Sequence, residues 1–193
     1  MTKIGDERIA FYLENRRQID EWARLKTEAV DAVYAVFQQL GEKLEAAVSG
    51  LDGAPLLMPF LESSYPAYAL IESSWPPAEP DRRVPVGVTL EMHRGELLSG
   101  PSVPKIYVGI RTERSLPGSK DLHTALRAAC GEQNFYATSY WPSLRYVPSP
   151  TDRWWEDRQA FEQTLVGGLV KAWDDLAPLV RTALKALDAS PSG

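Results

Sequence analysis

The single cysteine, Cys130, is the strongest nucleophile that this sequence offers, and thiol catalysis needs a general base beside it. His123 stands seven residues earlier in a segment of helical periodicity, which separates the two by about 10 Å along the helix axis. Cys130 also lies near the C-terminal end of that helix, where the dipole disfavours a thiolate. We therefore interpret Cys130 as a small buried structural residue.

Metal and nucleotide chemistry also lack their usual sequence patterns. Two histidines and one cysteine leave only carboxylate-rich metal sites, and no run of Asp and Glu has the spacing of a calcium loop. The glycines form no phosphate-binding loop, because Gly167 and Gly168 lie inside a segment of helical periodicity and the turn at Gly100 has no lysine placed to hold a phosphate. We expect no bound metal and no cofactor.

One acidic pattern does suggest metal-dependent chemistry. Pro80 and Asp81 are followed, ten residues after the aspartate, by Glu91 and His93 on a predicted strand. This resembles the Pro-Asp…Glu-x-Lys layout of metal-dependent nucleases, in which two acidic side chains hold a divalent ion and a lysine orients the attacking water. His93 stands in place of the lysine, and Asp81 falls in a polar turn. We interpret the segment as a hairpin with a charged turn and keep as the alternative a divergent or degenerate nuclease with Asp81, Glu91 and His93 as catalytic residues.

Aromatic and arginine side chains gather between residues 135 and 158. Such side chains stack on bases, proline-rich peptides or sugars, and Trp and Arg are favoured at protein interfaces. The simpler interpretation is that Trp154 and Trp155 both pack the junction between sheet and final helix. Because they are adjacent, however, at most one can face inward comfortably, and the other is the best candidate for an exposed contact. The candidate binding residues are Trp141, Arg145, Tyr146, Arg153, Trp154, Trp155 and Arg158.

The composition is that of a globular protein, with 44% hydrophobic and 24% charged residues in a chain of 193. Such a chain can bury about 70% of the surface exposed in its unfolded form. A net charge of −5 argues against general affinity for phosphate backbones, so nucleic-acid binding through the arginines is a weaker alternative. One cysteine excludes an internal disulfide, and no apolar run approaches the roughly 20 residues that cross a bilayer. We predict one cytoplasmic domain over residues 1–193, frayed at 1–5 and 189–193.

The N-terminal residues 6–48 have helical periodicity, and Asp6 is the expected N-cap. An unbroken helix here would be on the order of 60 Å long, more than the diameter of a compact domain of this size. It must break near Asn15 or Gly41, curve, or protrude. A protruding helix would expose apolar surface for a second subunit or another protein to cover, whereas a kinked helix would lie across its own sheet. The apolar stripe comprises Tyr12, Ile19, Trp22, Val30, Val33, Phe37, Leu40, Leu44 and Val48.

The middle of the chain changes its apolar period from 3.6 to 2, which predicts an antiparallel meander. Pro59 confines the first strand to a sheet edge. A short helix is expected from Ser119, ending at Gly131, a residue that suits the left-handed conformation after a helix. The strand candidates are 56–61, 68–71, 86–92, 106–110, 134–140 and 144–147.

The last segment, residues 152–187, is again helical, with a kink or a fresh start expected at Pro178. The predicted fold is α+β: a small antiparallel meander sheet packed on one face by long N- and C-terminal helices. The leading functional hypothesis is a non-enzymatic protein-interaction or regulatory protein. It follows from the missing catalytic constellation, the overlong first helix and the clustered aromatic and arginine residues.

Overall fold

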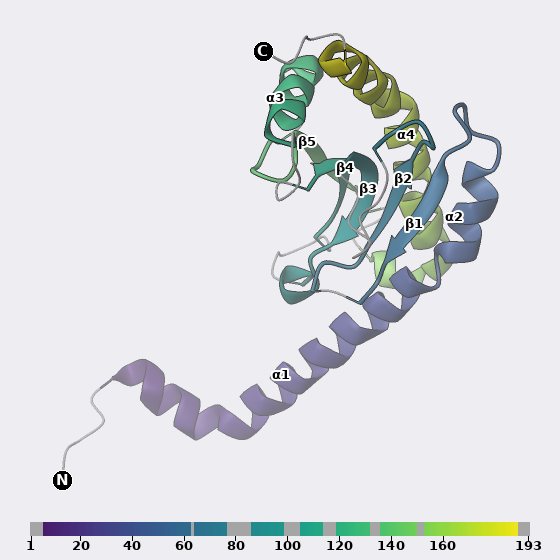
Figure 1. Ribbon diagram of the computed structural model, residues 1–193. Helices are drawn as coiled ribbons and strands as arrows, with labels where there is room; N and C mark the ends of the chain where they lie inside the picture. The colour runs from purple at the N-terminus through teal and green to yellow at the C-terminus, as the bar shows by residue number, and fades with distance from the viewer. Residues whose placement is uncertain are drawn as a thin grey trace.

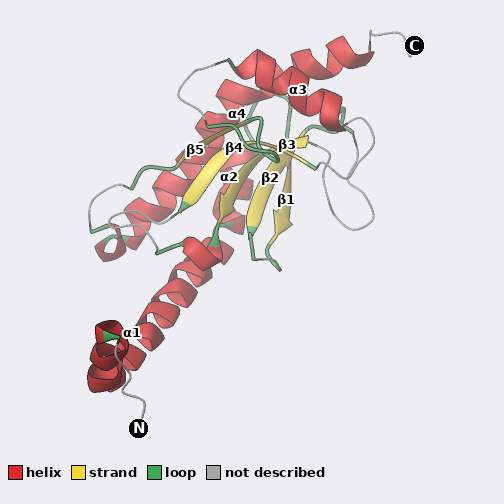
Figure 2. Cartoon of the chain, turned by 90° about the vertical axis from the view of Figure 1, so that its left-hand side faces the viewer, coloured by secondary structure: helices red, strands yellow, loops and turns green. Residues whose placement is uncertain are grey.

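The computed structural model describes residues 6–62, 64–76, 86–98, 105–113, 119–131, 136–149 and 153–188. Figures 1 and 2 show a sheet backed by helices, from which the first helix projects. No helix in these ranges is both long and apolar enough to span a membrane. The helices are α1 (Glu7–Gln38), α2 (Gly41–Val48), α3 (Ser119–Cys130) and α4 (Arg158–Asp188), with 3-10 turns η1 (Arg94–Glu96) and η2 (Trp154–Glu156). The strands are β1 (Leu56–Phe60), β2 (Ala67–Ile71), β3 (Val86–Met92), β4 (Ile106–Thr112) and β5 (Ser143–Tyr146).

The described strands form one antiparallel sheet in the order β1-β2-β3-β4-β5, which confirms the predicted meander. Pro59 lies in the edge strand β1, where a residue without an N–H costs the ladder least. In the middle of the sheet, Glu91 of β3 pairs with Tyr107 of β4, and Leu90 pairs with Val108. Successive side chains point to opposite faces of a strand. The sheet therefore has a core face with Leu90 and Val108, and a polar face with Glu91 and Tyr107.

Three helices cover the core face: α4 lies along β3 and β4, α2 lies beside it next to β1, and α3 packs on α4 and on the side of β4 and β5 (Figure 1). Glu162 of α4 is buried and forms ion pairs with Lys43 of α2 and with Arg158 one turn earlier in α4. The hydrogen bond from Lys43 is the main reason that the pKa of Glu162 is lowered. Trp173 fills the centre of the core, and its Nε1 donates to the carbonyl oxygen of Asp52 at 2.9 Å.

One local prediction for the C-terminal half is wrong. A strand is expected over residues 134–140, but residues 136–140 form only an isolated bridge at Tyr136. The N–H of Thr138 donates to the carbonyl of Trp141 at 2.8 Å, and this bond turns the chain. Residues 134 and 135 lie outside the described ranges. Of the two outcomes expected at Pro178, a kink or a fresh start, the fresh start does not occur, since α4 runs through this residue. Pro178 is exposed, so water can reach the carbonyl that it leaves without a donor. Figure 1 shows the C-terminal part of α4 bending. The predicted end of α3 is confirmed, because Gly131 has a φ of +59°.

The N-terminal periodic segment breaks between Gln38 and Gly41, at the second of the two predicted positions. The predicted N-cap is confirmed, since the carboxylate of Asp6 accepts a backbone N–H of the first turn at 2.9 Å. At Asn15 the helix continues, and the side-chain Nδ2 donates to the carbonyl of Phe11 at 2.9 Å. Such side-chain bonds to the preceding turn often bend helices, and Figure 2 shows α1 bent in its N-terminal half.

Only the C-terminal part of α1 packs on the body. The ring of Phe37 is fully buried and lies 5.4 Å from that of Tyr68 in β2. Arg94 of η1 forms an ion pair with Asp31 at 2.6 Å. Residues 7–29, which we call the arm, are exposed at all but two positions and project away from the sheet (Figure 1).

Candidate functional site

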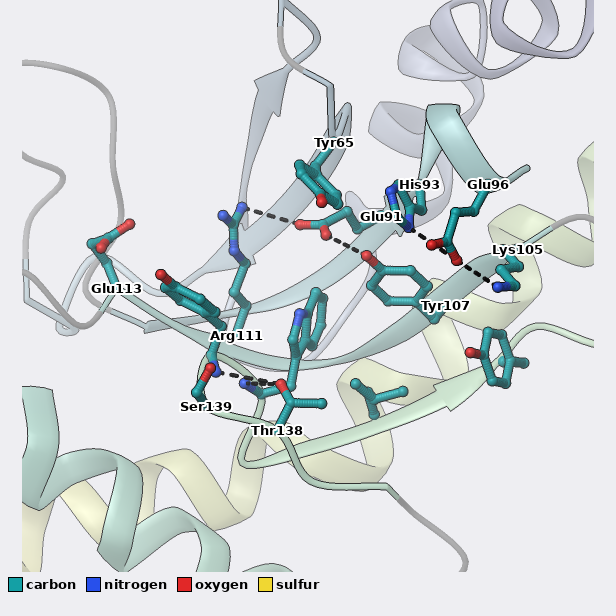
Figure 3. A pocket seen from close by; sticks show the side chains of 14 residues that line it. Tyr65, Glu91, His93, Glu96, Lys105, Tyr107, Arg111, Glu113, Thr138 and Ser139 are labelled. Atoms are coloured by element: carbon teal, nitrogen blue, oxygen red, sulfur yellow. Dashed lines mark hydrogen bonds and ion pairs between the residues drawn. The ribbon is translucent and has the colours of Figure 1, made fainter. Parts of the chain in front are cut away.

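The polar face of the sheet carries an open pocket of about 740 Å³, which we call the sheet pocket. This volume falls within the range of small-molecule sites. The floor is formed by side chains that alternate with the core residues of β3 and β4, and the segment before β5 closes one side (Figure 3). Among the described residues the lining consists of Tyr65, Glu91, His93, Glu96, Lys105, Tyr107, Arg111, Glu113, Thr138, Ser139, Tyr140, Trp141, Leu144 and Tyr146.

Glu91 is the buried centre of the sheet pocket and is only 3% exposed. The hydroxyl of Tyr107, its neighbour across the β3–β4 ladder, donates to Oε1 at 2.6 Å. Nη1 of Arg111 lies 3.1 Å from Oε2 on the other side (Figure 3). The N–H groups of Arg111 are poorly aligned with Oε2, however, and this oxygen receives no hydrogen bond from any side chain or backbone group that the structure describes. The pocket therefore contains a buried carboxyl group with one oxygen still able to accept a hydrogen bond.

Burial raises the pKa of Glu91, although the charge of Arg111 and the hydrogen bond from Tyr107 act in the opposite direction. Burial also raises the pKa of Tyr107, and the neighbouring negative charge of Glu91 raises it further. Tyr107 therefore keeps its proton and serves as a hydrogen-bond donor. The three side chains form a linked polar unit on the pocket floor.

We expect the substitution Glu91→Gln to change how stability depends on pH. A raised pKa means that the folded chain holds the Glu91 proton more tightly than the unfolded chain does. The wild type should therefore lose stability relative to Glu91→Gln as the pH rises from the ordinary glutamate range through the raised pKa. Urea midpoints of both proteins, measured from about pH 4 to about pH 8, test this. Parallel curves for the two proteins would show that Glu91 titrates normally.

A second polar unit lies at the rim of the sheet pocket. Nζ of Lys105 donates to the carboxylate of Glu96 at 2.5 Å, and this hydrogen bond lowers the pKa of Glu96 and raises that of Lys105. Nδ1 of His93 lies 3.7 Å from the same carboxylate, and its ring packs on Tyr65 with centroids 4.7 Å apart. The cationic side chains of the rim thus lie next to carboxylates of the same pocket.

Aromatic rings make up much of the remaining wall. Trp141 is buried, with its ring 5.2 Å from that of Tyr107 in an edge-on arrangement. Of the twelve large hydrophobic side chains that are exposed in the described ranges, six belong to the arm and four are tyrosines in or beside the sheet pocket. Exposed apolar surface is therefore concentrated in two places. The four tyrosines are Tyr65, Tyr136, Tyr140 and Tyr146.

The residues of the nuclease-like pattern are only partly accounted for. Glu91 of β3 and His93, the first residue after β3, both line the sheet pocket, and Asp81 lies outside the described residues. Within those residues no group of three His, Cys, Asp or Glu could hold a metal ion. Arg111 lies beside Glu91, where its charge would repel a divalent cation. Among the described residues, Glu91 is therefore the ion-pair partner of Arg111.

The predicted aromatic and arginine cluster divides between two regions. Trp141 and Tyr146 line the sheet pocket, whereas η2 carries the two adjacent tryptophans. Trp154 is buried, with its ring 4.8 Å from that of Phe161, and Trp155 is 61% exposed. One tryptophan therefore faces inward and the other outward, as their adjacency requires.

The arginines of the cluster all pair with carboxylates. Arg145 reaches Asp175 of α4 at 3.5 Å, on the side of the sheet away from the pocket. Arg153 and Arg158 pair with acidic residues three and four positions further along the chain, at 2.9 Å and 2.6 Å. Their charges are locally balanced, and the three do not converge on one phosphate-binding surface.

The sequence interpretation missed Tyr107, Arg111 and Lys105. A signal for the first two was present, because the alternation of β4 places Tyr107 and Arg111 on the face opposite Val108. Lys105 lies just before β4, where no periodicity applies.

Comparisons of the chain with protein-family models, with curated proteins and with solved structures found no match.

Proposed function

We propose that this chain is a non-enzymatic protein-interaction protein that self-associates through the arm. The observation that carries this proposal is the exposed apolar surface of α1: half of the exposed large hydrophobic side chains in the described ranges lie on the arm. A helix in water draws most of its stability from packing an apolar face, and against the part of the chain that the structure describes the arm remains exposed at all but two positions. The six side chains are Ile9, Phe11, Tyr12, Leu13, Trp22 and Leu25.

The charge distribution along the arm favours a second copy as the occupant. Residues 7–19 carry three basic and two acidic side chains, whereas residues 20–29 carry two basic and three acidic ones. Two arms in antiparallel orientation would set the basic half of each beside the acidic half of the other. A parallel pair would place the acidic halves together, and like charges disfavour that arrangement. We therefore infer an antiparallel, two-fold symmetric contact.

The size of the arm is compatible with such a contact. Its 23 residues span roughly 35 Å, with a helix diameter of about 10 Å. Two arms side by side would bury on the order of several hundred Å² on each chain, approaching the roughly 800 Å² per partner of a standard interface. Arg94 and Phe37 hold the base of the helix to the body, so both bodies would lie outside the pair of arms.

We propose a cytoplasmic setting for this association. The supporting observation is the chemistry of Cys130, a free thiol buried in the structure, as expected where disulfides are rare.

Replacing Trp22 by glutamate should abolish self-association. Trp22 is 59% exposed on the arm, and a charge at that position would have to be desolvated between the two helices. The molar mass from light scattering after size-exclusion chromatography should fall from that of a dimer to that of the single chain. Trp155→Glu is the matched control, because Trp155 is equally exposed but lies on η2; this variant should keep the mass of the wild type. Equal masses for wild type and Trp22→Glu, with unchanged circular dichroism, would refute the proposal.

A further inference from the structure

The sheet pocket has a chemistry that the proposed self-association does not use. Tyr65, Tyr140 and Tyr146 line it with 43 to 50% of their surface exposed, although tyrosine rings in a folded protein are usually more deeply buried. Their flat faces offer apolar contact, and each hydroxyl group can donate or accept a hydrogen bond. A ligand for these walls needs both an apolar face and polar edges.

The pocket floor adds a buried acceptor. Glu91 is more than nine-tenths buried, faces the pocket between Tyr107 and Arg111 (Figure 3), and has one oxygen without a hydrogen bond from the described residues. A buried acceptor in this state costs free energy until a donor reaches it. Oε2 is buried beside Arg111, so a ligand hydroxyl or amide group would provide that donor after a displacement of the Arg111 side chain.

The charges of the pocket argue for a neutral ligand. Glu91 lies against Arg111, and Glu96 against Lys105, so each of these cations is already balanced by a carboxylate. A phosphate or carboxylate ligand would have to displace the pocket's own acids. A cationic ligand would have to approach Glu91 past Arg111. Binding of a nucleic-acid strand, which depends on neutralising phosphates, lacks the excess of positive charge that it needs.

We propose that the sheet pocket binds a neutral carbohydrate. A sugar ring has an apolar face of C–H groups that can lie on a tyrosine ring, and hydroxyl groups around its edge that can donate to Glu91 or to the hydroxyl oxygen of Tyr107 and accept from Arg111. The pocket volume of about 740 Å³ admits more than one sugar ring and lies in the upper part of the range for small-molecule sites. The exposed tyrosines and the buried acceptor thereby serve one ligand.

The test uses the full-length chain on an array of neutral glycans, acidic glycans and nucleosides. The protein should be retained on a subset of neutral glycans. Tyr146→Ala should reduce the affinity for these by about tenfold, because one stacking face is lost. Trp155→Ala, which removes a still more exposed aromatic residue outside the pocket, should bind as the wild type does. Titration of the best neutral glycan into ¹⁵N-labelled protein should shift the amide signals of Glu91 and Tyr107.

Three results would overturn the proposal. The first is no retention on any neutral glycan. The second is equal retention of Tyr146→Ala and the wild type, with urea midpoints showing that both are folded. The third is retention only on acidic glycans or nucleosides, which would assign the pocket to a charged ligand or a base.

Discussion

The substitution Gly109→Ala is expected to destabilise the fold by about 3 kcal/mol or more, at the upper end of the cost of overpacking. A Cβ at this position would lie 2.0 Å from the carbonyl oxygen of Ser143 and 2.7 Å from Cα of Leu144. Both are backbone atoms of β5, which cannot rotate away as a side chain can. Since β4 is also paired with β3 on its other side, β5 would have to move, and Leu144 and Tyr146 would leave the wall of the sheet pocket.

The matched control for Gly109→Ala is Gly167→Ala. Gly167 lies inside α4, and no atom comes within 4 Å of a Cβ built there. Alanine in a helix interior should stabilise the protein by about 0.5–1 kcal/mol relative to glycine. Urea unfolding followed by circular dichroism should thus shift the midpoint in opposite directions for the two variants. Shifts of the same sign and size would mean that the close approach of β4 and β5 is not as described.

Trp173→Ala is expected to cost about 3–5 kcal/mol, the usual range for removing a buried aromatic side chain. Trp173 is 1% exposed, its ring lies 5.4 Å from that of Trp75, and its Nε1 donates to the carbonyl of Asp52. The substitution leaves a cavity between α4 and the sheet and removes the bond that ties the loop after α2 to α4. A loss of this size is a large share of the stability of an ordinary domain.

Trp155→Ala provides the comparison for Trp173→Ala. Trp155 is 61% exposed, and its described ring contact is an edge-on one with Trp154 at 5.8 Å. Its removal should cost less than about 1 kcal/mol. Guanidinium unfolding of both variants, followed by tryptophan fluorescence and circular dichroism, measures the difference. A cost for Trp173→Ala no greater than that for Trp155→Ala would contradict the placement of the core.

The sheet and the short helix were predictable because their signals are local. Residues 86–92 alternate between apolar and other side chains, and the structure forms β3 over the same residues. Pro59 indicated an edge strand, and β1 is one. Gly131 indicated the end of α3, which stops at Cys130. In each case a few neighbouring residues determine the backbone conformation.

The path of the first helix could not be chosen from sequence alone. Tyr12 and Trp22 belong to the same apolar stripe as Val33 and Phe37, yet the first two are exposed and the last two are buried. Periodicity shows that a face is apolar, but it does not show what that face packs on. The choice depends on contacts with distant segments, such as the ion pair of Asp31 with Arg94.

The sheet pocket was only partly predictable, for a similar reason. His93 directly follows β3 in an extended conformation and stands two positions after Glu91, so their shared face follows from alternation. Tyr65, Arg111 and Trp141 reach the pocket from three other segments, of which only that of Arg111 is a strand; strand pairing and the paths of the loops before β2 and β5 bring them together. The cluster expected from proximity in sequence divides instead, with Trp141 in the pocket and Trp155 on η2.

Sedimentation equilibrium of the unmodified chain, over a range of concentrations, is the most direct test of the account. If the arms of two chains pack against each other, the measured mass should approach twice the 21.5 kDa of one chain as concentration rises. A mass of 21.5 kDa at every concentration would leave the apolar face of the arm uncovered and would contradict the account.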